Sequence, residues 1–170
     1  FLGQRIRLAR CDPDWQRLAS AEWTGRIEAR TAFTDGFPLL VTSTASLAEL
    51  NRRLACAGHD AVTMQRFRPN LVIDGFEDAH AEDFIDTLAI DSPDGEVTIK
   101  LVKPCGRCTI PDVNPATAEQ GHVVADTMAA YRAEPRIGGA LAFGQNAVIV
   151  KGVGRRVKVG AEVRATLAFG

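Results

Sequence analysis

Two cysteines are the side chains of this sequence best suited to chemistry. Cys105 and Cys108 lie in residues 103–115, which read Lys-Pro-Cys-Gly-Arg-Cys-Thr-Ile-Pro-Asp-Val-Asn-Pro. Prolines restrict the backbone, so a thiol in this segment is expected on a rigid loop. Lys103 and Arg107 are near Cys108 in sequence and would favour its thiolate, the form that binds metals or attacks electrophiles. We therefore interpret Cys108 as a candidate ligand or nucleophile and expect Cys105 to pack as a small apolar side chain.

Two other chemistries of a Cys-x-x-Cys pair fit the sequence less well. A structural zinc site needs two more ligands, and no histidine or further cysteine has a partner at ligand spacing. A thioredoxin-type redox pair begins a helix, whereas Pro111 and Pro115 follow the cysteines too closely for one. A purely structural role, with both thiols buried, stays open as an alternative.

The composition predicts one globular domain without a global binding signal. The chain has 170 residues, 46% of them apolar, and its formal net charge is −1. That charge gives no indication of nucleic acid or of an anionic membrane as partner, so any basic site must be local. The four cysteines do not have the spacing of a disulfide framework, and no apolar run is long enough for a membrane span. We expect a cytoplasmic protein, and the first residue, Phe1, suggests a fragment of a longer one.

The elements around the cysteine loop are expected to be short strands with a few helices. Residues 39–42 form a buried strand by pattern, and residues 47–54 a helix with Ser46 as N-cap and Glu49 completing a capping box. Residues 67–73 look like an edge strand because they contain a proline, with Arg66 and Arg68 on one face.

The remaining segments support a mainly β fold. Strands are expected at residues 3–11, 88–91, 97–102, 141–143, 147–150 and 157–167, a short helix at 126–131, an irregular or helical excursion at 12–30, and a solvated acidic loop at 77–86. Many short strands with close turn signals predict a compact, mainly antiparallel β-barrel with a few short helices. We expect residues 1–36 to be an N-terminal extension or linker strand and residues 37–167 to form the core barrel.

The cysteine loop also resembles a known family. Residues 103–110, followed by Val-Asn-Pro at 113–115, are similar to the cysteine loop of MOSC domains, which are found in molybdenum cofactor sulfurases and amidoxime-reducing components. The resemblance includes residues 37–54, the Arg-Phe-Arg-Pro-Asn-Leu-Val-Ile segment at 66–73, Phe-Gly-Gln-Asn at 143–146 and Val-Gly at 159–160. The sequence departs from the family at Asn114, which replaces an aspartate, and at residues 116–120, which lengthen the turn.

This resemblance implies a β-barrel that holds the molybdenum cofactor (molybdopterin), a pterin dithiolene with a phosphate. It implies that Cys108 is the thiolate ligand of molybdenum and that Arg68 and Asn70 contact the cofactor. A soft thiolate suits a metal already bound by sulfur, and a guanidinium offers a phosphate two parallel hydrogen bonds. Ser43 would add a hydroxyl and backbone N–H groups before a helix. The expected cofactor-binding residues are Arg68, Asn70, Ser43, Lys103 and Arg107.

Three functions fit this site. The first is a molybdenum-dependent reductase of N-hydroxylated small molecules, which receives electrons from an iron–sulfur, flavin or cytochrome protein. The second is sulfur transfer through a persulfide on Cys108, with pyridoxal phosphate only on a desulfurase partner. The third is a cofactor carrier without catalysis. Larger relatives have an N-terminal barrel domain, which we expect in the parent chain, and the acidic stretch could dock a basic electron donor.

Overall fold

The computed structural model describes residues 16–32 and 34–168, together with residues 3, 5, 7, 10, 12 and 14. Most of the strand expected at residues 3–11 falls outside the described residues. A two-stranded antiparallel ribbon, β1 (Arg17–Leu18) and β2 (Arg30–Thr31), brackets the short helix α1 (Ala21–Thr24). This segment packs on the main sheet, because Ala19, Ala29, Phe37 and Val148 share one apolar cluster.

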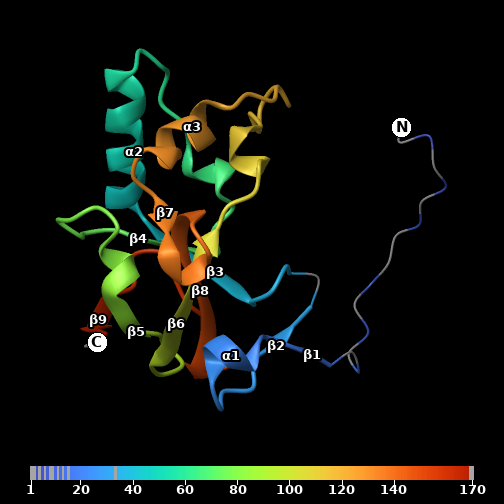
Figure 1. Cartoon of the computed structure of the whole chain (residues 1–170). Coiled ribbons are helices and arrows are strands. Elements are labelled where there is room, and N and C mark those ends of the chain that lie inside the picture. Colours follow the sequence, from blue (N-terminus) through green and yellow to red (C-terminus); the bar gives the residue numbers. More distant parts are fainter. Residues whose placement is uncertain are drawn as a thin grey trace.

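A curled seven-stranded sheet forms the centre of the molecule (Figure 1). Its strands are β3 (Leu39–Ser43), β4 (Leu71–Ile73), β5 (Ile85–Ile90), β6 (Val97–Gly106), β7 (Ala133–Glu134), β8 (Ala140–Lys151) and β9 (Val163–Leu167). The order is β4-β3-β8-β6-β5-β9, with β7 added beside β8. All neighbours are antiparallel except β3 and β4. The mainly β, barrel-like class predicted from the sequence is confirmed.

Two helices stand together at one end of this sheet (Figure 1). They are α2 (Thr44–Cys56) and α3 (Val123–Ala129). Four 3₁₀ turns complete the described elements: η1 (Met64–Arg66), η2 (Ala81–Phe84), η3 (Ile110–Asp112) and η4 (Pro135–Ile137). Within the part of the chain that the structure describes, no helix has both the length and the apolar character needed to cross a membrane.

The core between the helices and the sheet fixes the turn that precedes β4. Leu50 and Leu54 of α2 and Met128 of α3 pack with Phe67 and Phe143 in one buried cluster. The rings of Phe67 and Phe143 stack with centroids 3.9 Å apart. Each fully buried side chain of this kind contributes about 2 kcal/mol to folding, so Phe67 anchors its neighbours in sequence.

The start of α2 differs from the sequence-based expectation. Ser43, not Ser46, is the N-cap, and its Oγ accepts the backbone N–H of Ser46 at 3.1 Å. The predicted N-cap and capping box are therefore wrong. The reason is that β3 ends in extended geometry at Ser43, so the helix starts three residues earlier. Glu49 instead pairs along the helix surface with Arg52 at 2.7 Å and Arg53 at 2.6 Å.

The acidic stretch is not a simple solvated loop. Glu82 is only 1% exposed, and its carboxylate accepts the hydroxyls of Ser43 at 2.8 Å and Ser46 at 2.7 Å. Asp83 forms a buried ion pair with Arg132 at 2.8 Å. The prediction of a solvated loop was wrong here, because these two carboxylates find hydroxyl and guanidinium partners from distant segments.

Other boundaries were partly predicted. The hairpin of β5 and β6 is confirmed, although β6 continues to Gly106. The two strand pieces expected at 141–143 and 147–150 are one continuous strand, β8, which Gly144 allows by adopting a φ of +75°. The helix expected at 126–131 starts earlier, as α3, and the last strand is shorter than expected.

Candidate functional site

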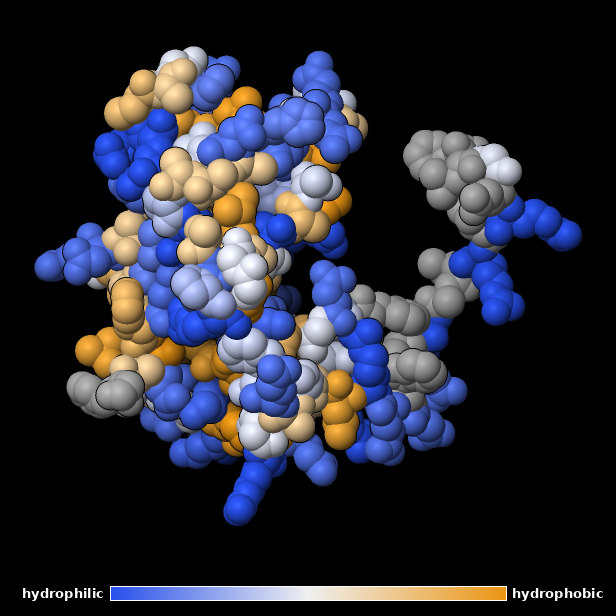
Figure 2. All heavy atoms as spheres, viewed as in Figure 1, coloured by the Kyte–Doolittle hydropathy of each residue, from blue (hydrophilic) through white to orange (hydrophobic). Residues whose placement is uncertain are grey.

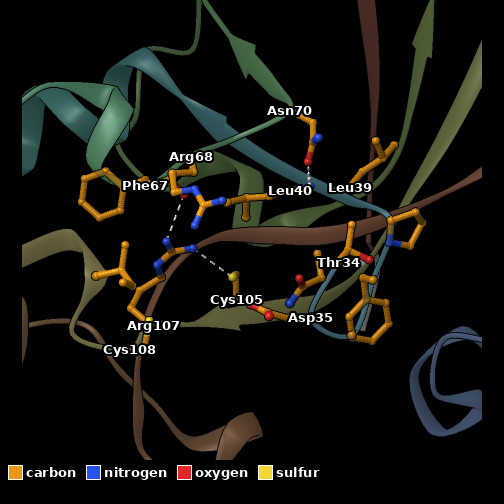
Figure 3. Close-up of a pocket in the computed structure, with 15 residues that line it drawn as sticks. Thr34, Asp35, Leu39, Leu40, Phe67, Arg68, Asn70, Cys105, Arg107 and Cys108 are labelled. Carbon is orange, nitrogen blue, oxygen red and sulfur yellow. Dashed lines mark hydrogen bonds between the residues drawn. The ribbon is translucent and has the colours of Figure 1, made fainter. Parts of the chain in front are cut away.

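A cavity of about 310 Å³ opens where the cysteine loop meets the turn before β4 (Figure 3). Its walls come from residues 34–40, the turn at 67–70, the cysteine loop at 105–110 and Asn146 of β8. Figure 2 shows the surface hollowed between the helical end of the molecule and the segment that leads into β3. Segments distant in sequence thus build this site together.

Arg107 holds the cysteine loop against the turn before β4. Its Nη1 donates to Sγ of Cys105 at 3.1 Å, and its Nη2 donates to the carbonyl oxygen of Phe67 at 3.0 Å (Figure 3). The guanidinium carbon also lies 5.6 Å from the centroid of the Phe67 ring. The remaining donor, Nε, is buried and has no hydrogen-bond partner among the described residues.

Arg68 directly follows the buried Phe67 and has a strained backbone conformation. Its φ is +55°, in the left-handed region that costs a residue with a side chain roughly 1–2 kcal/mol. This geometry interrupts the strand expected at residues 67–73, so β4 begins only at Leu71, and Arg66 lies in η1. The prediction that Arg66 and Arg68 share a strand face was wrong. Within the described part of the chain, the Arg68 guanidinium has neither a hydrogen-bond acceptor nor a carboxylate partner.

Asn70 fixes the turn to β3. Its backbone N–H donates to the carbonyl oxygen of Leu40 at 2.9 Å. Its Oδ1 accepts the backbone N–H of Leu40 at 2.8 Å, the bond that Figure 3 draws as a dashed line. These two bonds hold the turn in register with the sheet edge. They use the acceptor of the amide, so the Nδ2 donor of Asn70 is left for a ligand in the cavity.

The polar groups of the cavity favour an anion together with a soft metal. Arg68 and Arg107 supply two guanidinium groups, and Cys105 and Cys108 supply two sulfur atoms. Asp35, an exposed residue, adds one carboxylate to the lining. Guanidinium groups bind phosphate oxygens with paired hydrogen bonds, and thiolates prefer soft or sulfur-bound metals. Among the described residues, no group of three or more histidines, cysteines and carboxylates forms an all-protein metal site.

The structure gathers four of the six predicted site residues. Cys108, Arg68, Asn70 and Arg107 all line the cavity. Ser43 does not: it is fully buried, and its hydroxyl serves the helix start and Glu82. The reason is that the β3–α2 junction points this side chain into the interior.

Lys103 also lies elsewhere. Its Nζ is 4.9 Å from the centroid of the Trp23 ring, in α1, and it is not part of the cavity lining. A place near Cys108 in sequence therefore did not bring the ammonium group into the cavity. Cys105, which we expected to pack as a small apolar side chain, does line the cavity, and so does Asn146. The Phe-Gly-Gln-Asn motif was the one sequence signal for Asn146.

A comparison with protein families gives this geometry a context. The family described as MOSC domain matches residues 28–164. The chain belongs to the MOSC domain family. Mitochondrial amidoxime-reducing component 1 of Homo sapiens is 42% identical over 92 residues, which cover 54% of this chain and 25% of that protein.

Two further relatives extend the match. Mitochondrial amidoxime reducing component 2 of Homo sapiens is 38% identical over 104 residues, 61% of this MOSC chain and 28% of the relative. Component 1 of Mus musculus is 35% identical over 116 residues, 67% of this chain and 32% of the relative. The matched regions thus span between a quarter and a third of the length of these relatives.

Proposed function

We propose that this MOSC domain binds the molybdenum cofactor in the cavity at the cysteine loop, with Cys108 as the thiolate ligand of the metal. In the complete protein it would take part in the reduction of N-hydroxylated compounds. The observation that carries this proposal is that Cys108 and Arg68, forty residues apart in sequence, line one cavity. The names of the relatives, amidoxime-reducing components, support the reaction class.

The residues of the cavity fit such a cofactor. The buried Nε of Arg107 has no partner among the described residues. Arg68, an exposed residue that lines the same cavity, has no partner for its guanidinium among them either. A buried donor without an acceptor is costly, so an anionic group near Arg107 would relieve an unfavourable arrangement, and the exposed Arg68 guanidinium could bind the same anion. We assign Arg68 and Arg107 to the phosphate or pterin oxygens, with Asn70 Nδ2 as an additional donor.

The two cysteines have different roles in this proposal. Sγ of Cys105 accepts the hydrogen bond from Arg107, so this thiol helps to position the guanidinium. Cys108 is exposed, and its sulfur has no hydrogen-bond partner in the described part of the structure. Cys108 is therefore the sulfur available to a metal. When bound, the cofactor supplies a metal that exchanges two electrons and accepts oxygen from the substrate.

The ligand assignment can be tested by X-ray absorption at the molybdenum edge. The full-length protein and its Cys108→Ser variant would be produced in a host that makes the cofactor. We expect one sulfur ligand fewer in Cys108→Ser, because serine supplies oxygen in its place. Cys56→Ser is the matched control, since Cys56 is an exposed cysteine at the end of α2. The same number of sulfur ligands in all three proteins would refute the assignment.

A second measurement tests the arginine. Removing a hydrogen bond to a charged group costs about 1.5–3 kcal/mol, so Arg68→Gln should lower cofactor affinity by roughly 10- to 150-fold. The bound molybdopterin would be measured after oxidation to its fluorescent pterin. Arg52→Gln, on the exposed surface of α2, should leave the content unchanged. Equal contents in both variants would contradict a role of Arg68 in the cradle.

Sulfur transfer is the second candidate, because the exposed thiol of Cys108 is also accessible to a sulfur donor. It predicts a mass gain of one sulfur atom on Cys108 that a reductant removes. A carrier function predicts bound cofactor without turnover. The electron donor, the substrate, an N-terminal barrel domain in the parent chain and a desulfurase with pyridoxal phosphate remain predictions. So does the cytoplasmic location, and the relatives are mitochondrial by name.

A further inference from the structure

A second, smaller pocket adjoins the cysteine loop. It has a volume of about 160 Å³, and we call it the α3 pocket. Its apolar walls come from η3, α3 and β8: Pro111, Val124, Ala125, Met128 and Leu141. Arg107 and Cys108 line both the α3 pocket and the larger cavity. The proposed metal ligand therefore stands at the border between a polar cavity and an apolar one.

Hydrogen bonds hold the walls of the α3 pocket in place. Oδ1 of Asp112 accepts the backbone N–H groups of Val124 at 2.9 Å and Ala125 at 3.2 Å, which ties the start of α3 to η3. Val124 and Met128 are 2% and 1% exposed and belong to the core cluster. Side chains of the core and a fixed helix start thus form one side of the pocket, and the cysteine loop forms the other.

The size and polarity of the pocket restrict what it can hold. An enclosed apolar cavity of about 150 Å³ stays dry and accepts benzene. The α3 pocket is partly open to solvent, and its volume of 160 Å³ is large enough for a phenyl ring or a compact branched alkyl group. The pterin of the cofactor is a poor occupant, because its many polar atoms would lose their hydrogen bonds against these walls.

We infer that the α3 pocket binds the apolar substituent of the substrate while the N-hydroxylated end faces Cys108. This inference rests on the proposed function and adds the part of the fold that would receive the aryl or branched alkyl group of an N-hydroxylated substrate. In this view the small side chain of Ala125, which is one of the pocket walls, leaves room for the substituent. A larger side chain at this position occupies the space intended for the substituent.

The first experiment compares two substrates. Cofactor-loaded full-length protein, reduced chemically with viologen, would turn over a phenyl-substituted and a methyl-substituted amidoxime. We expect Ala125→Leu to lower kcat/KM for the phenyl compound about tenfold or more and to change that for the methyl compound less than twofold. Ala129→Leu, an exposed position on the same helix, is the matched control and should change neither. An unchanged ratio in Ala125→Leu would overturn the inference.

The second experiment needs no turnover. Toluene binding to the cofactor-free full-length protein would be followed by NMR. Wild type and Ala129→Leu should bind toluene, and Ala125→Leu should not. Circular dichroism would verify the fold of each protein, and Ala125→Val replaces Ala125→Leu if the latter fails to fold. Equal toluene binding in all proteins would overturn the α3 pocket, whether or not the enzyme is active.

The two experiments separate this inference from the function on which it rests. Absence of molybdenum-dependent turnover in wild type would refute the reductase function. Turnover with an unchanged phenyl-to-methyl ratio, together with loss of toluene binding, would leave the reductase function standing and refute only the assignment of the substrate to the α3 pocket.

Discussion

Replacing Gly144 by alanine should destabilise the protein far more than the same change at Gly138. Both glycines have positive φ, +75° and +69°, which costs alanine roughly 1–2 kcal/mol. At Gly138 no atom lies within 4 Å of the added Cβ. At Gly144 the Cβ would lie 2.5 Å from the carbonyl oxygen of Val41 and 2.7 Å from Cγ2 of Thr42. The backbone of β3 would have to move.

The expected loss of stability has two contributions, the positive φ and the close contacts of the added Cβ. Gly138→Ala should cost about 1 kcal/mol, the conformational term alone. Gly144→Ala adds overpacking in a tightly paired part of the sheet, typically about 1–3 kcal/mol, for a total of about 2–4 kcal/mol. With a urea dependence of about 2 kcal/mol per molar, the expected midpoint shifts are about 0.5 M for Gly138→Ala and about 1–2 M for Gly144→Ala.

Urea unfolding followed by far-UV circular dichroism measures both shifts. The comparison removes the effect of glycine on the unfolded chain, because the two substitutions are identical. Equal shifts would refute the argument from close approach and would mean that β3 and β8 adapt to the methyl group. A large shift for Gly138→Ala would show that the conformational term was undervalued.

Two further predictions concern the buried polar groups. Glu82→Ala leaves two buried serine hydroxyls without their acceptor, so it should lower the free energy of unfolding by about 3 kcal/mol. Urea titrations measure this loss, and the exposed control Glu77→Ala should lose less than about 0.5 kcal/mol. Burial, together with the nearby charge of Arg132, lowers the pKa of His80 from 6.5 to about 4. The unfolded chain then binds the proton first, so stability should fall by about 2–3 kcal/mol, allowing for screening, as the pH drops from 6.5 to 4. His80→Asn should remove this part of the pH dependence of the urea midpoint, and the exposed control His59→Asn should retain it. If the urea midpoint depends on pH equally in both variants, the role of His80 is contradicted.

The sequence by itself determined the features that depend on near neighbours. Alternating apolar residues and a Pro-Asp-Gly turn predicted the β5–β6 hairpin, and the structure confirms it. The family motif at residues 103–110 and the Arg-Pro-Asn turn indicated a MOSC domain, which the family match confirms. These signals are local, because strand period and turn type are set within a few residues.

The tertiary structure decided which of the marked residues meet. Arg107 reaches the carbonyl oxygen of Phe67 across forty positions, and Ser43 turns away from the cavity to bind Glu82, thirty-nine positions on. No short-range pattern encodes such pairs, since they depend on how the sheet curls and on where the helices pack. For the same reason the sequence marked both cysteines, but only the fold shows Cys105 held by Arg107 and Cys108 at the border of two cavities.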